Sequence, residues 1–278
     1  MARITLEDVV RLDYDRVAGE IGEFLRAKLE EAGAKGYVIG ISGGVDSATT
    51  FFLAVKSVGA ERVLPLIMPD SEVTPREDVE DAKELARLAG LNPHVIDIAP
   101  IVRVYTSTIP IYEGSEYDRV PTGNLRARIR MSLLYYYANK LDLLVLGTGD
   151  RSEILIGYFT KYGDGGVDLL PIGILYKSQV RRLAVKLGVP ERVAFKPSSP
   201  RLWPGQTAEG ELGVSYDQVD LVLYAVFDLG MDPSEVPEAT GVSEAVVERV
   251  MDMYRRSEHK RNPPPTPPLD IVRRARGS

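Results

Sequence analysis

The sequence predicts an α/β protein: a parallel five-stranded sheet with helices on both faces, Rossmann-like, with extra C-terminal helices. Two observations predict this class. Short, continuous apolar runs alternate with amphipathic segments of helical period, which is typical of parallel strands that are buried on both faces. After residue 195 the apolar runs stop and only helical patterns return. Strands that alternate with helices along a chain form parallel sheets that those helices cover.

The N-terminal half supplies three of the predicted strands. Thr74 suits the N-cap of a helix and Pro75 its first position, while Gly90 suits the position after its last turn. The expected elements, in order, are N-terminal helices within 1–33, a strand at 37–41, a helix at 45–58, a strand at 62–69, the helix that ends at Gly90, and a strand at 94–98.

The C-terminal half supplies the other two strands. Residues 196–212 are long, polar and rich in Pro and Gly, so we expect a mobile active-site loop there. The Pro-rich tail, 263–278, resembles a polyproline II segment. We expect one domain over 1–278, because no repeat or boundary interrupts it. The expected elements are a helix at 121–140, a strand at 143–147, a fifth strand at 168–173, and helices at 176–188, 215–229, 233–239 and 243–257.

The composition excludes several classes of function. The chain has 278 residues, a net charge of −6, no cysteine and two histidines. Without cysteine there can be no disulfide, thiolate metal site or cysteine nucleophile. The acidic charge disfavours nucleic acids and anionic membranes as partners, and no apolar run approaches the ~18 residues of a membrane span. The acidic N-terminus does not resemble a signal peptide, so we expect a cytoplasmic protein.

A glycine-rich corner, GISGGVDS, runs from Gly40 to Ser47 between a buried strand and a helix. Gly43 and Gly44 allow backbone angles and close approaches that side chains would block. Successive N–H groups at a helix N-terminus bind anions, yet the spacing matches neither a Walker A loop nor a dinucleotide fingerprint. Asp46 makes sense there if it holds a cation such as Mg²⁺ against phosphate oxygens. The alternative is a plain turn with N-capping serines.

The pattern S-G-G-x-D-S after a buried strand resembles the pyrophosphate-binding loop of the adenine-nucleotide alpha hydrolases. Those enzymes cleave ATP between the α and β phosphates and adenylate a substrate oxygen. The loop alone leaves open GMP synthetase, argininosuccinate synthetase, asparagine synthetase, tRNA-modifying enzymes and NAD synthetase. The resemblance implies an alpha hydrolase-like fold and ATP contacts along the loop at Gly40, Ile41, Ser42, Gly43, Gly44, Val45, Asp46 and Ser47.

Five further segments look like the motif series of NAD synthetase, in order and in spacing, over nearly the whole chain from about residue 15. They are 123–131, 147–173, 176–184, 202–220 and 258–264. The resemblance is to the ammonia-dependent NAD synthetases, which are carbon–nitrogen ligases. It implies that ATP drives the amidation of deamido-NAD with ammonia through an acyl adenylate. The products would be NAD, AMP and pyrophosphate, in the last step of NAD biosynthesis.

Thr148 and Glu153 follow the predicted strand 143–147. The carboxyl ends of parallel strands share one rim, so both residues should lie on the same side as Asp46. By resemblance, Asp46 and Glu153 bind Mg²⁺, although a solvated helix position is the alternative for Glu153. Lys177 begins a helix, an unfavourable place for a cation that suggests a phosphate partner. The resemblance assigns ATP contacts to Thr148, Lys177 and Ser199.

The deamido-NAD site is assigned by resemblance to Arg128, Lys161, Asp168, His259 and Lys260. Residues two apart do not share a helix face, so the neighbours of Arg128, Arg126 and Arg130, are expected to be structural. From the residues alone, 161–168 could equally be a surface hairpin. His259 and Lys260 could form a basic helix cap. His94, just before a strand, is expected to be structural.

The implied mechanism needs no side-chain nucleophile, since the protein positions groups and neutralises charge. Asp46, Glu153 and Lys177 would do so, and Asp168 is our candidate for taking a proton from ammonia. Glutamine-using relatives carry an extra domain with a cysteine nucleophile. We therefore expect this chain to use free ammonia or ammonia from a separate protein.

NAD synthetases are homodimers, and the resemblance therefore implies a homodimer here. Leu133, Leu134 and Tyr137, in the helix expected at 121–140, would belong either to the core or to the subunit interface.

Two other functions compete with this interpretation. Another ligase of the superfamily, such as a GMP synthetase core or a tRNA-thiolating enzyme, is one. The absence of cysteine counts against thiolation, and the acidic charge counts against a tRNA substrate. The second is a catalytically silent nucleotide-binding regulator. Such a protein is expected to have lost its metal pair, yet Asp46 and Glu153 are both present.

Overall fold

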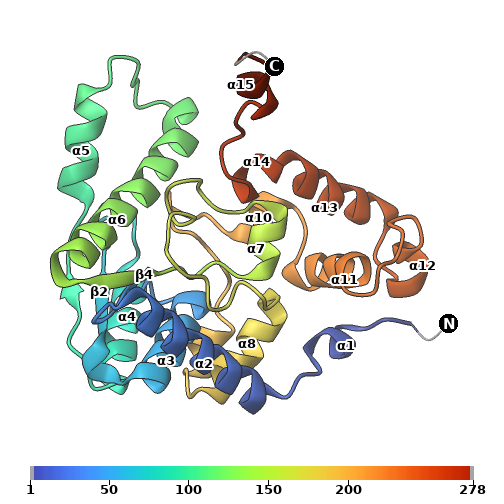
Figure 1. Ribbon diagram of the computed structural model, residues 1–278, viewed down its shortest axis with the longest axis horizontal. Coiled ribbons are helices and arrows are strands. Elements are labelled where there is room, and N and C mark those ends of the chain that lie inside the picture. The colour runs from blue at the N-terminus through green and yellow to red at the C-terminus, as the bar shows by residue number, and fades with distance from the viewer. Residues whose placement is uncertain (1–2, 276–278) are drawn as a thin grey trace.

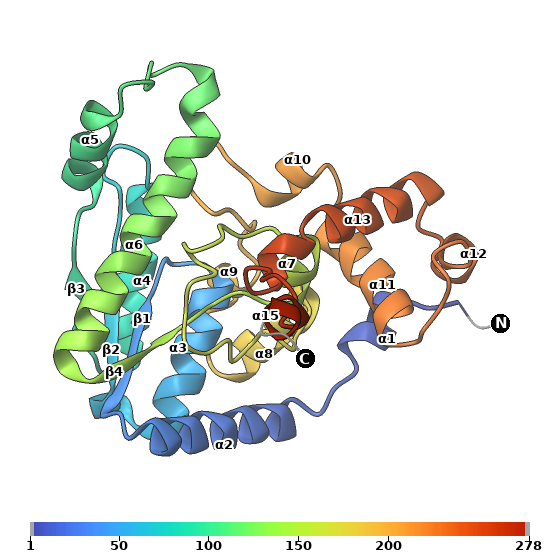
Figure 2. The ribbon, with the colours of Figure 1, turned by 45° about the horizontal axis from the view of Figure 1, so that its top comes forward.

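The structure is a computed structural model, and it describes residues 3–275. A parallel sheet of four strands has the order β3–β2–β1–β4 (Figures 1 and 2). The strand order reverses at β1, because β2 and β3 lie on one side of it and β4 on the other. Open parallel sheets bind ligands at such a reversal, outside the carboxyl ends of the strands. The strands are β1 (Gly36–Gly40), β2 (Val63–Ile67), β3 (His94–Val95) and β4 (Leu143–Leu146).

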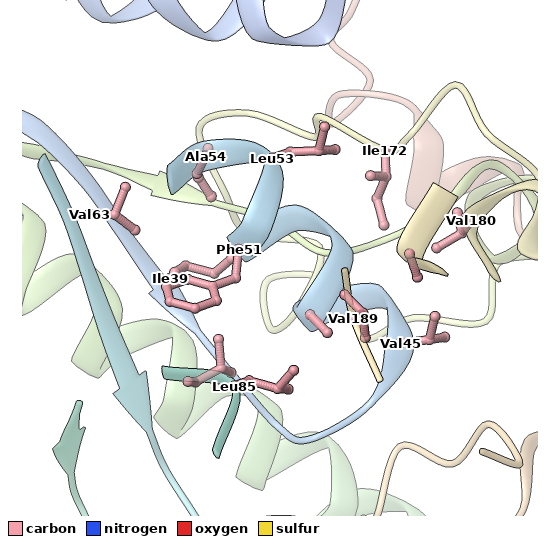
Figure 3. Packing of buried hydrophobic residues seen from close by; sticks show 14 of the residues in the cluster. Ile39, Val45, Phe51, Leu53, Ala54, Val63, Leu85, Ile172, Val180 and Val189 are labelled. Carbon is pink, nitrogen blue, oxygen red and sulfur yellow. The ribbon is translucent and has the colours of Figure 1, made fainter. Parts of the chain in front are cut away.

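Alternate residues of the strands enter two separate cores, as the period of two in a strand requires. On β1, Tyr37 and Ile39 enter one core and Val38 enters the other. In Figure 3, Ile39, Phe51 and Leu85 point toward one another from β1, α3 and α4. The first face carries α2 (Tyr14–Ala32), α3 (Val45–Val58), α4 (Arg76–Leu88) and α8 (Lys177–Lys186), and the second carries α5 (Ala99–Thr108) and α6 (Arg119–Leu141).

A third core lies beside the sheet, where the first helix packs among the C-terminal helices (Figure 2). Gln179 on α8 donates its side-chain amide to the carbonyl oxygen of Val9 at 2.8 Å, which fastens α1 to the start of α8. The helices of this core are α1 (Leu6–Val10), α7 (Arg151–Ile156), α10 (Ala208–Leu212), α11 (Tyr216–Phe227), α12 (Val236–Thr240) and α13 (Glu244–Arg256). The remaining elements are η1 (Ala60–Arg62), η2 (Glu116–Asp118), α9 (Glu191–Ala194), α14 (Glu258–Arg261) and α15 (Asp270–Ala275).

The predicted fifth strand at 168–173 is wrong. Leu169 makes one isolated parallel bridge with Leu146, and the N–H of Gly147 donates to Leu169 O at 2.8 Å. The chain then turns, with the N–H of Gly173 donating to Leu170 O at 3.0 Å. Pro171 lies within this turn and has no N–H with which to extend a ladder. The apolar run therefore packs beside β4 without joining the sheet as a strand.

Other boundaries differ by less. The helix predicted to begin at Pro75 begins at Arg76, with Pro75 as its N-cap, because the Thr74 hydroxyl instead accepts the N–H of Asp70 at 3.1 Å. The strand predicted at 94–98 keeps ladder pairing at His94 and Val95 alone. Helix α10 occupies the end of the 196–212 segment and α15 part of the tail. Residues 1–2 and 276–278 of the predicted terminal segments lie outside the described residues.

The predicted helix at 45–58 is confirmed as α3, and the N-terminal pattern resolves into α1 and α2. Between residues 3 and 275, no helix combines the length and the apolar character that crossing a bilayer requires. The single-domain organisation and the mobility of 196–212 stay predictions.

Candidate functional site

A cavity of about 450 Å³ opens at the carboxyl edge of the sheet, where β1 and β4 end. The whole 40–47 loop lines it, and so do Thr148, Glu153, Ser199 and Lys260. Helix α6 contributes Asn124 and Arg130, and the segment after α9 contributes residues 196–203. The cavity therefore lies at the reversal of strand order, where an open parallel sheet binds its ligand.

The 40–47 loop needs glycine at one position for two reasons. Gly43 has a φ of +82°, and a Cβ there would lie 2.3 Å from the carbonyl oxygen of Asp78. The Ser47 hydroxyl accepts the N–H of Ser42 and donates to Gly44 O, both at 3.1 Å. These bonds fix the loop at the N-terminus of α3, where unpaired N–H groups and the helix dipole favour an anion.

Beneath the loop lies a group of four charged side chains that we call the lysine cluster: Lys177, Asp46, Asp150 and Glu153. The Lys177 ammonium lies 2.7 Å from an Asp46 oxygen, 2.9 Å from an Asp150 oxygen and 2.8 Å from a Glu153 oxygen. The Lys177 and Asp150 side chains are fully buried, whereas Asp46 keeps 21% and Glu153 18% of side-chain exposure. The Tyr216 ring centroid lies 5.0 Å from the ammonium, as in a cation–π contact.

The cluster keeps its lysine charged. Burial alone would lower the pKa of Lys177, but Asp150, Asp46 and Glu153 together raise that pKa well above its usual value. Burial raises the pKa of Asp150 to about 7, with Asp46 adding to the rise and Lys177 opposing it. Burial likewise raises the pKa of Glu153. One ammonium thus faces more carboxylate than it neutralises.

Local capping explains why these residues meet. Asp150 is the N-cap of α7 and accepts the N–H of Glu153 at 2.8 Å, which places both carboxylates in one turn. Lys177 is the first residue of α8, and its N–H donates to the Ser152 hydroxyl at 3.0 Å. The Asp220 carboxylate on α11 accepts that hydroxyl at 2.5 Å and the N–H of Ser178 at 2.8 Å. A buried hydrogen-bond network thus joins α7, α8 and α11.

The residues present fit a divalent cation that arrives with phosphate. The Oδ1 atom of Asp46 is buried and has no hydrogen-bond partner, so it is an acceptor that a cation would satisfy. Among residues 3–275, no three Asp, Glu or His side chains are grouped so as to enclose a metal ion by themselves. Mg²⁺ is usually held by one or two carboxylates together with phosphate oxygens and water. Asp46 and Glu153 line the cavity together with Asp78, Asp164 and Glu211, and they are the two lining carboxylates that belong to the lysine cluster.

The segment after α9 brings two cations to the cavity that the sequence analysis did not select. The Lys196 ammonium contacts Asp78 at 2.5 Å and Asp81 at 2.6 Å. The Arg201 guanidinium donates to Asp78 at 2.7 Å. The Ser199 hydroxyl donates to the carbonyl oxygen of Gln206 at 2.6 Å, inside the same segment. Ion pairs with α4 therefore hold this segment against the cavity.

The predicted deamido-NAD residues lie mostly outside the cavity. A guanidinium nitrogen of Arg128 donates to the carbonyl oxygen of Lys161 at 3.4 Å, and the Lys161 ammonium donates to His259 O, so these three are neighbours. Asp168 is held apart from them, because its carboxylate accepts the N–H of Val145 at 2.7 Å and the Tyr135 hydroxyl at 3.0 Å. Its proposed role toward ammonia stays a prediction.

The C-terminal helix α14 is tied to the chain that follows α7. The Lys260 ammonium donates to the carbonyl oxygens of Gly157 and Phe159, both at 2.7 Å. Arg261 donates to Leu155 O at 2.7 Å. Lys260 thus lines the cavity while it also fixes the backbone of the 155–159 segment.

The expected structural arginines have structural contacts. Arg126 donates to the buried Asp70 carboxylate at 2.6 Å, and Arg130 donates to Met68 O at 2.9 Å. His94 lies 3.2 Å from the Tyr137 hydroxyl, outside the cavity. Leu133, Leu134 and Tyr137 pack, half-buried, against the core on the α5–α6 face, and their part in a subunit interface stays a prediction.

Sequence reasoning missed Asp150, Ser152, Tyr216 and Asp220. Asp150 could have been found, because Asp150 and Glu153 have the spacing of a capping box at the start of a helix. Nothing local marks Ser152 or Asp220, whose contact spans 68 residues of chain.

A parallel sheet with an anion-binding loop and a cavity at its reversal of strand order defines an α/β protein of the nucleotide-binding class. The sequence profile described as NAD synthase matches residues 17–264, and the chain belongs to this family.

The sequences of known relatives match almost the full length of the chain. A protein of Aeropyrum pernix named NH(3)-dependent NAD(+) synthetase is 58% identical over 272 residues, which are 98% of this chain and 95% of that protein. One of the same name from Hyperthermus butylicus is 60% identical over 265 residues, 95% of each chain.

Solved structures agree in fold. The structure of NMN synthetase from Francisella tularensis superposes with a TM-score of 0.81 at 33% identity, over 93% of this chain and 100% of that one. NH3-dependent NAD synthetase from Campylobacter jejuni superposes with a TM-score of 0.76 at 27% identity, over 92% of this chain and 100% of that one.

Proposed function

We propose that the protein is an ammonia-dependent NAD synthetase: it uses ATP to amidate deamido-NAD, giving NAD, AMP and pyrophosphate. One observation supports this more than any other. The 40–47 loop, built to bind an anion, lies directly above carboxylates that fit a divalent cation, at the ligand edge of the sheet. Such a pair of sites suits ATP whose pyrophosphate is to leave. The relatives are named NH(3)-dependent NAD(+) synthetases, and deamido-NAD is the molecule that ammonia would convert to NAD.

The reaction would proceed in two transfers. A carboxylate oxygen of the nicotinate ring attacks the α-phosphorus of ATP, the bond to the β-phosphate bridging oxygen breaks, and pyrophosphate leaves. Neutral ammonia then attacks the acyl carbon of the adenylate, loses a proton, and expels AMP. The N–H groups of the 40–47 loop would hold the leaving pyrophosphate, and Thr148 and Ser199 would contact ATP at the cavity wall. The protein therefore acts by positioning and charge neutralisation.

Mg²⁺, held by Asp46 and Glu153, would neutralise charge on the phosphate oxygens. Lys177 would supply a positive charge from the floor of the site, where its stem is buried and its ammonium lies beside both carboxylates. The 196–212 segment would exclude water from the adenylate, since residues 196–203 already line the cavity. Arg128, Lys161 and His259, neighbours on the rim, would bind the acceptor together with Lys260.

The direct test is a product assay. Purified full-length protein with ATP, Mg²⁺, ammonium and deamido-NAD should form NAD and AMP in equal amounts. Absence of NAD, with xanthosine monophosphate instead amidated to GMP while ATP is cleaved to AMP, would refute the proposal. Asp46→Asn should fold normally and lose turnover, whereas Asp217→Asn, half-exposed on α11, should keep it. Near-normal turnover in Asp46→Asn would remove Asp46 from the metal site.

A second acceptor deserves a parallel measurement because of one comparison. The Francisella tularensis structure, 33% identical to this chain, is named an NMN synthetase. Amidation that yields NMN starts from nicotinate mononucleotide, the half of deamido-NAD that contains the reacting carboxylate. We expect a higher kcat/KM with deamido-NAD than with nicotinate mononucleotide. The reverse order would move the assignment to an NMN synthetase.

We also propose that the chain forms a homodimer through the α5–α6 side of the sheet. Several large apolar side chains of α5, α6 and the segment between them are exposed there, and contiguous exposed apolar surface is typical of interaction sites. They include Val104 at 63%, Ile111 at 85%, Tyr117 at 91% and Tyr136 at 61% exposure. The cytoplasmic location and the use of free ammonia stay predictions.

A further inference from the structure

Contacts among its own four side chains hold the lysine cluster together. The Lys177 ammonium touches one oxygen of each of three carboxylates, all at 2.7–2.9 Å, which are ordinary distances for charge-assisted hydrogen bonds and ion pairs. Two of these carboxylates, Asp46 and Glu153, are the ones we assign to the metal. The third, Asp150, is fully buried and does not line the cavity.

The backbone of Lys177 is fixed, so only its side chain can change partners. Its backbone N–H is held by Ser152, and the helix that it begins is fixed through Ser178 and Asp220. The Tyr216 ring closes one side of the ammonium. Lysine carries its charge on a flexible four-carbon stem, so the ammonium can change partners while the backbone stays in place.

The cluster has a surplus of acceptors. Three carboxylates and one ammonium leave two formal negative charges. The Oδ1 atom of Asp46 also lacks a hydrogen-bond partner. A buried surplus of this kind is unfavourable unless another cation or a proton joins it. The cluster therefore resembles a cation site that is filled in part by the protein itself.

We propose that, before metal and nucleotide bind, the Lys177 ammonium occupies the cation position between Asp46 and Glu153, with Asp150 as its third carboxylate contact. The proposal rests on the metal role of Asp46 and Glu153 in the proposed function. A divalent ion alone must displace the ammonium and therefore binds weakly. A triphosphate in the 40–47 loop offers Lys177 a second anionic partner, so metal and nucleotide load together.

Mn²⁺ binding to the nucleotide-free, full-length protein tests this directly, by the electron paramagnetic resonance signal of free Mn²⁺. The decisive variant combines Lys177→Met with Asp150→Asn. It removes one positive and one negative charge, so the cluster keeps the formal charge of the wild type. Only the competing Lys177 ammonium and the buried Asp150 carboxylate beside it are lost. We expect this variant to bind Mn²⁺ at least about tenfold more tightly than the wild type, which is a free-energy change of ~1.4 kcal/mol.

Asp150→Asn alone is the matched control. It removes a negative charge but keeps the ammonium, so Mn²⁺ should bind no more tightly than to the wild type. Lys177→Met alone should bind Mn²⁺ at least as tightly as the double variant. It leaves three carboxylates unpaired, so circular dichroism must show that it is folded, and the double variant decides the question if it is not.

Equal Mn²⁺ affinity in the wild type and the double variant would overturn the proposal. So would an equal gain in Asp150→Asn, because the effect would then come from removal of Asp150 and not of the ammonium. No acceptor or ATP is present, so these results are independent of the product assay. Formation of NAD together with equal Mn²⁺ affinities would keep the proposed function and refute the role of Lys177.

Discussion

The buried Asp220 offers the sharpest test of how the site is held together. Its carboxylate accepts the Ser152 hydroxyl at 2.5 Å and the N–H of Ser178 at 2.8 Å, and it has no exposed surface. Asp220→Ala leaves both donors buried without a partner, at ~1–3 kcal/mol each. Removal of a buried carboxylate offsets part of that cost, since burial itself raises the pKa of Asp220. We expect the free energy of unfolding to fall by about 3 kcal/mol.

Urea unfolding followed by far-ultraviolet circular dichroism measures this change by linear extrapolation. Asp217→Ala is the matched control, because Asp217 lies on the same helix with 55% of its side chain exposed and 3.8 Å from Arg181. An exposed pair of that kind is worth less than ~1 kcal/mol. Asp220→Ala should also lower turnover by roughly 10–100-fold. The reason is that Asp220 holds Ser152 and Ser178, and these two residues fix the backbone that positions Lys177.

This prediction is refuted if the free energies of unfolding of Asp220→Ala and Asp217→Ala differ by less than ~1 kcal/mol at equal m-values. A large loss of stability with unchanged turnover would confirm that Asp220 stabilises the fold and refute its role in positioning Lys177.

Three further predictions use other parts of the molecule. Gly157→Ala should lower the free energy of unfolding by about 3 kcal/mol, because the φ of Gly157 is +70° and a Cβ there would lie 2.0 Å from the Cβ of Ser257. Gly188→Ala should lower it by about 1 kcal/mol, because Gly188 has a φ of +92° but open space around it. Equal losses of stability in urea unfolding would contradict this. Leu25→Ala, fully buried in the first core, should cost ~2–5 kcal/mol, and a loss below ~1 kcal/mol would mean that the core is not packed as described. Tyr117→Asp should shift the protein from dimer to monomer in analytical ultracentrifugation while its circular dichroism stays unchanged, and an unaltered dimer would exclude this face.

Local chemistry made part of this molecule predictable from sequence. The glycines and serines of the 40–47 loop carry their conformational preferences with them, so the corner and helix α3 follow from eight residues and the apolar run before them. The same holds for Gly90, whose φ of +73° ends its helix as expected. Helix geometry separated Arg128 from Arg126 and Arg130, but the choice of Arg128 for the substrate came from the family resemblance, and it is Arg130 that lines the cavity.

Elements that depend on distant partners were not predictable. Helix α5 is rich in Ile, Val and Thr, which favour strands, yet α5 packs as a helix against α6. The 168–173 run has the composition of a strand, and a single Pro171 in a turn keeps it out of the sheet.

The surroundings of Lys177 in the site were likewise not predictable from the sequence. Its place at a helix start suggested a phosphate partner, but the structure surrounds it with carboxylates from α3 and α7. No local pattern encodes a contact that joins residues more than a hundred positions apart, such as Asp46 and Lys177.

The bonds from α14 to the 155–159 segment bear on the order in which the site matures during synthesis. Lys260 and Arg261, more than a hundred residues further along the chain, supply the hydrogen bonds that hold the carbonyls of Leu155, Gly157 and Phe159. The 40–47 loop and strands β1, β2 and β3 lie in the first half of the chain, and β4 ends at Leu146, so these elements can form while the ribosome is still adding residues. The wall of the cavity that Lys260 completes must wait until the chain has grown past residue 261. A nascent chain could therefore expose a formed loop for phosphate before it has a finished enclosure for the adenylate.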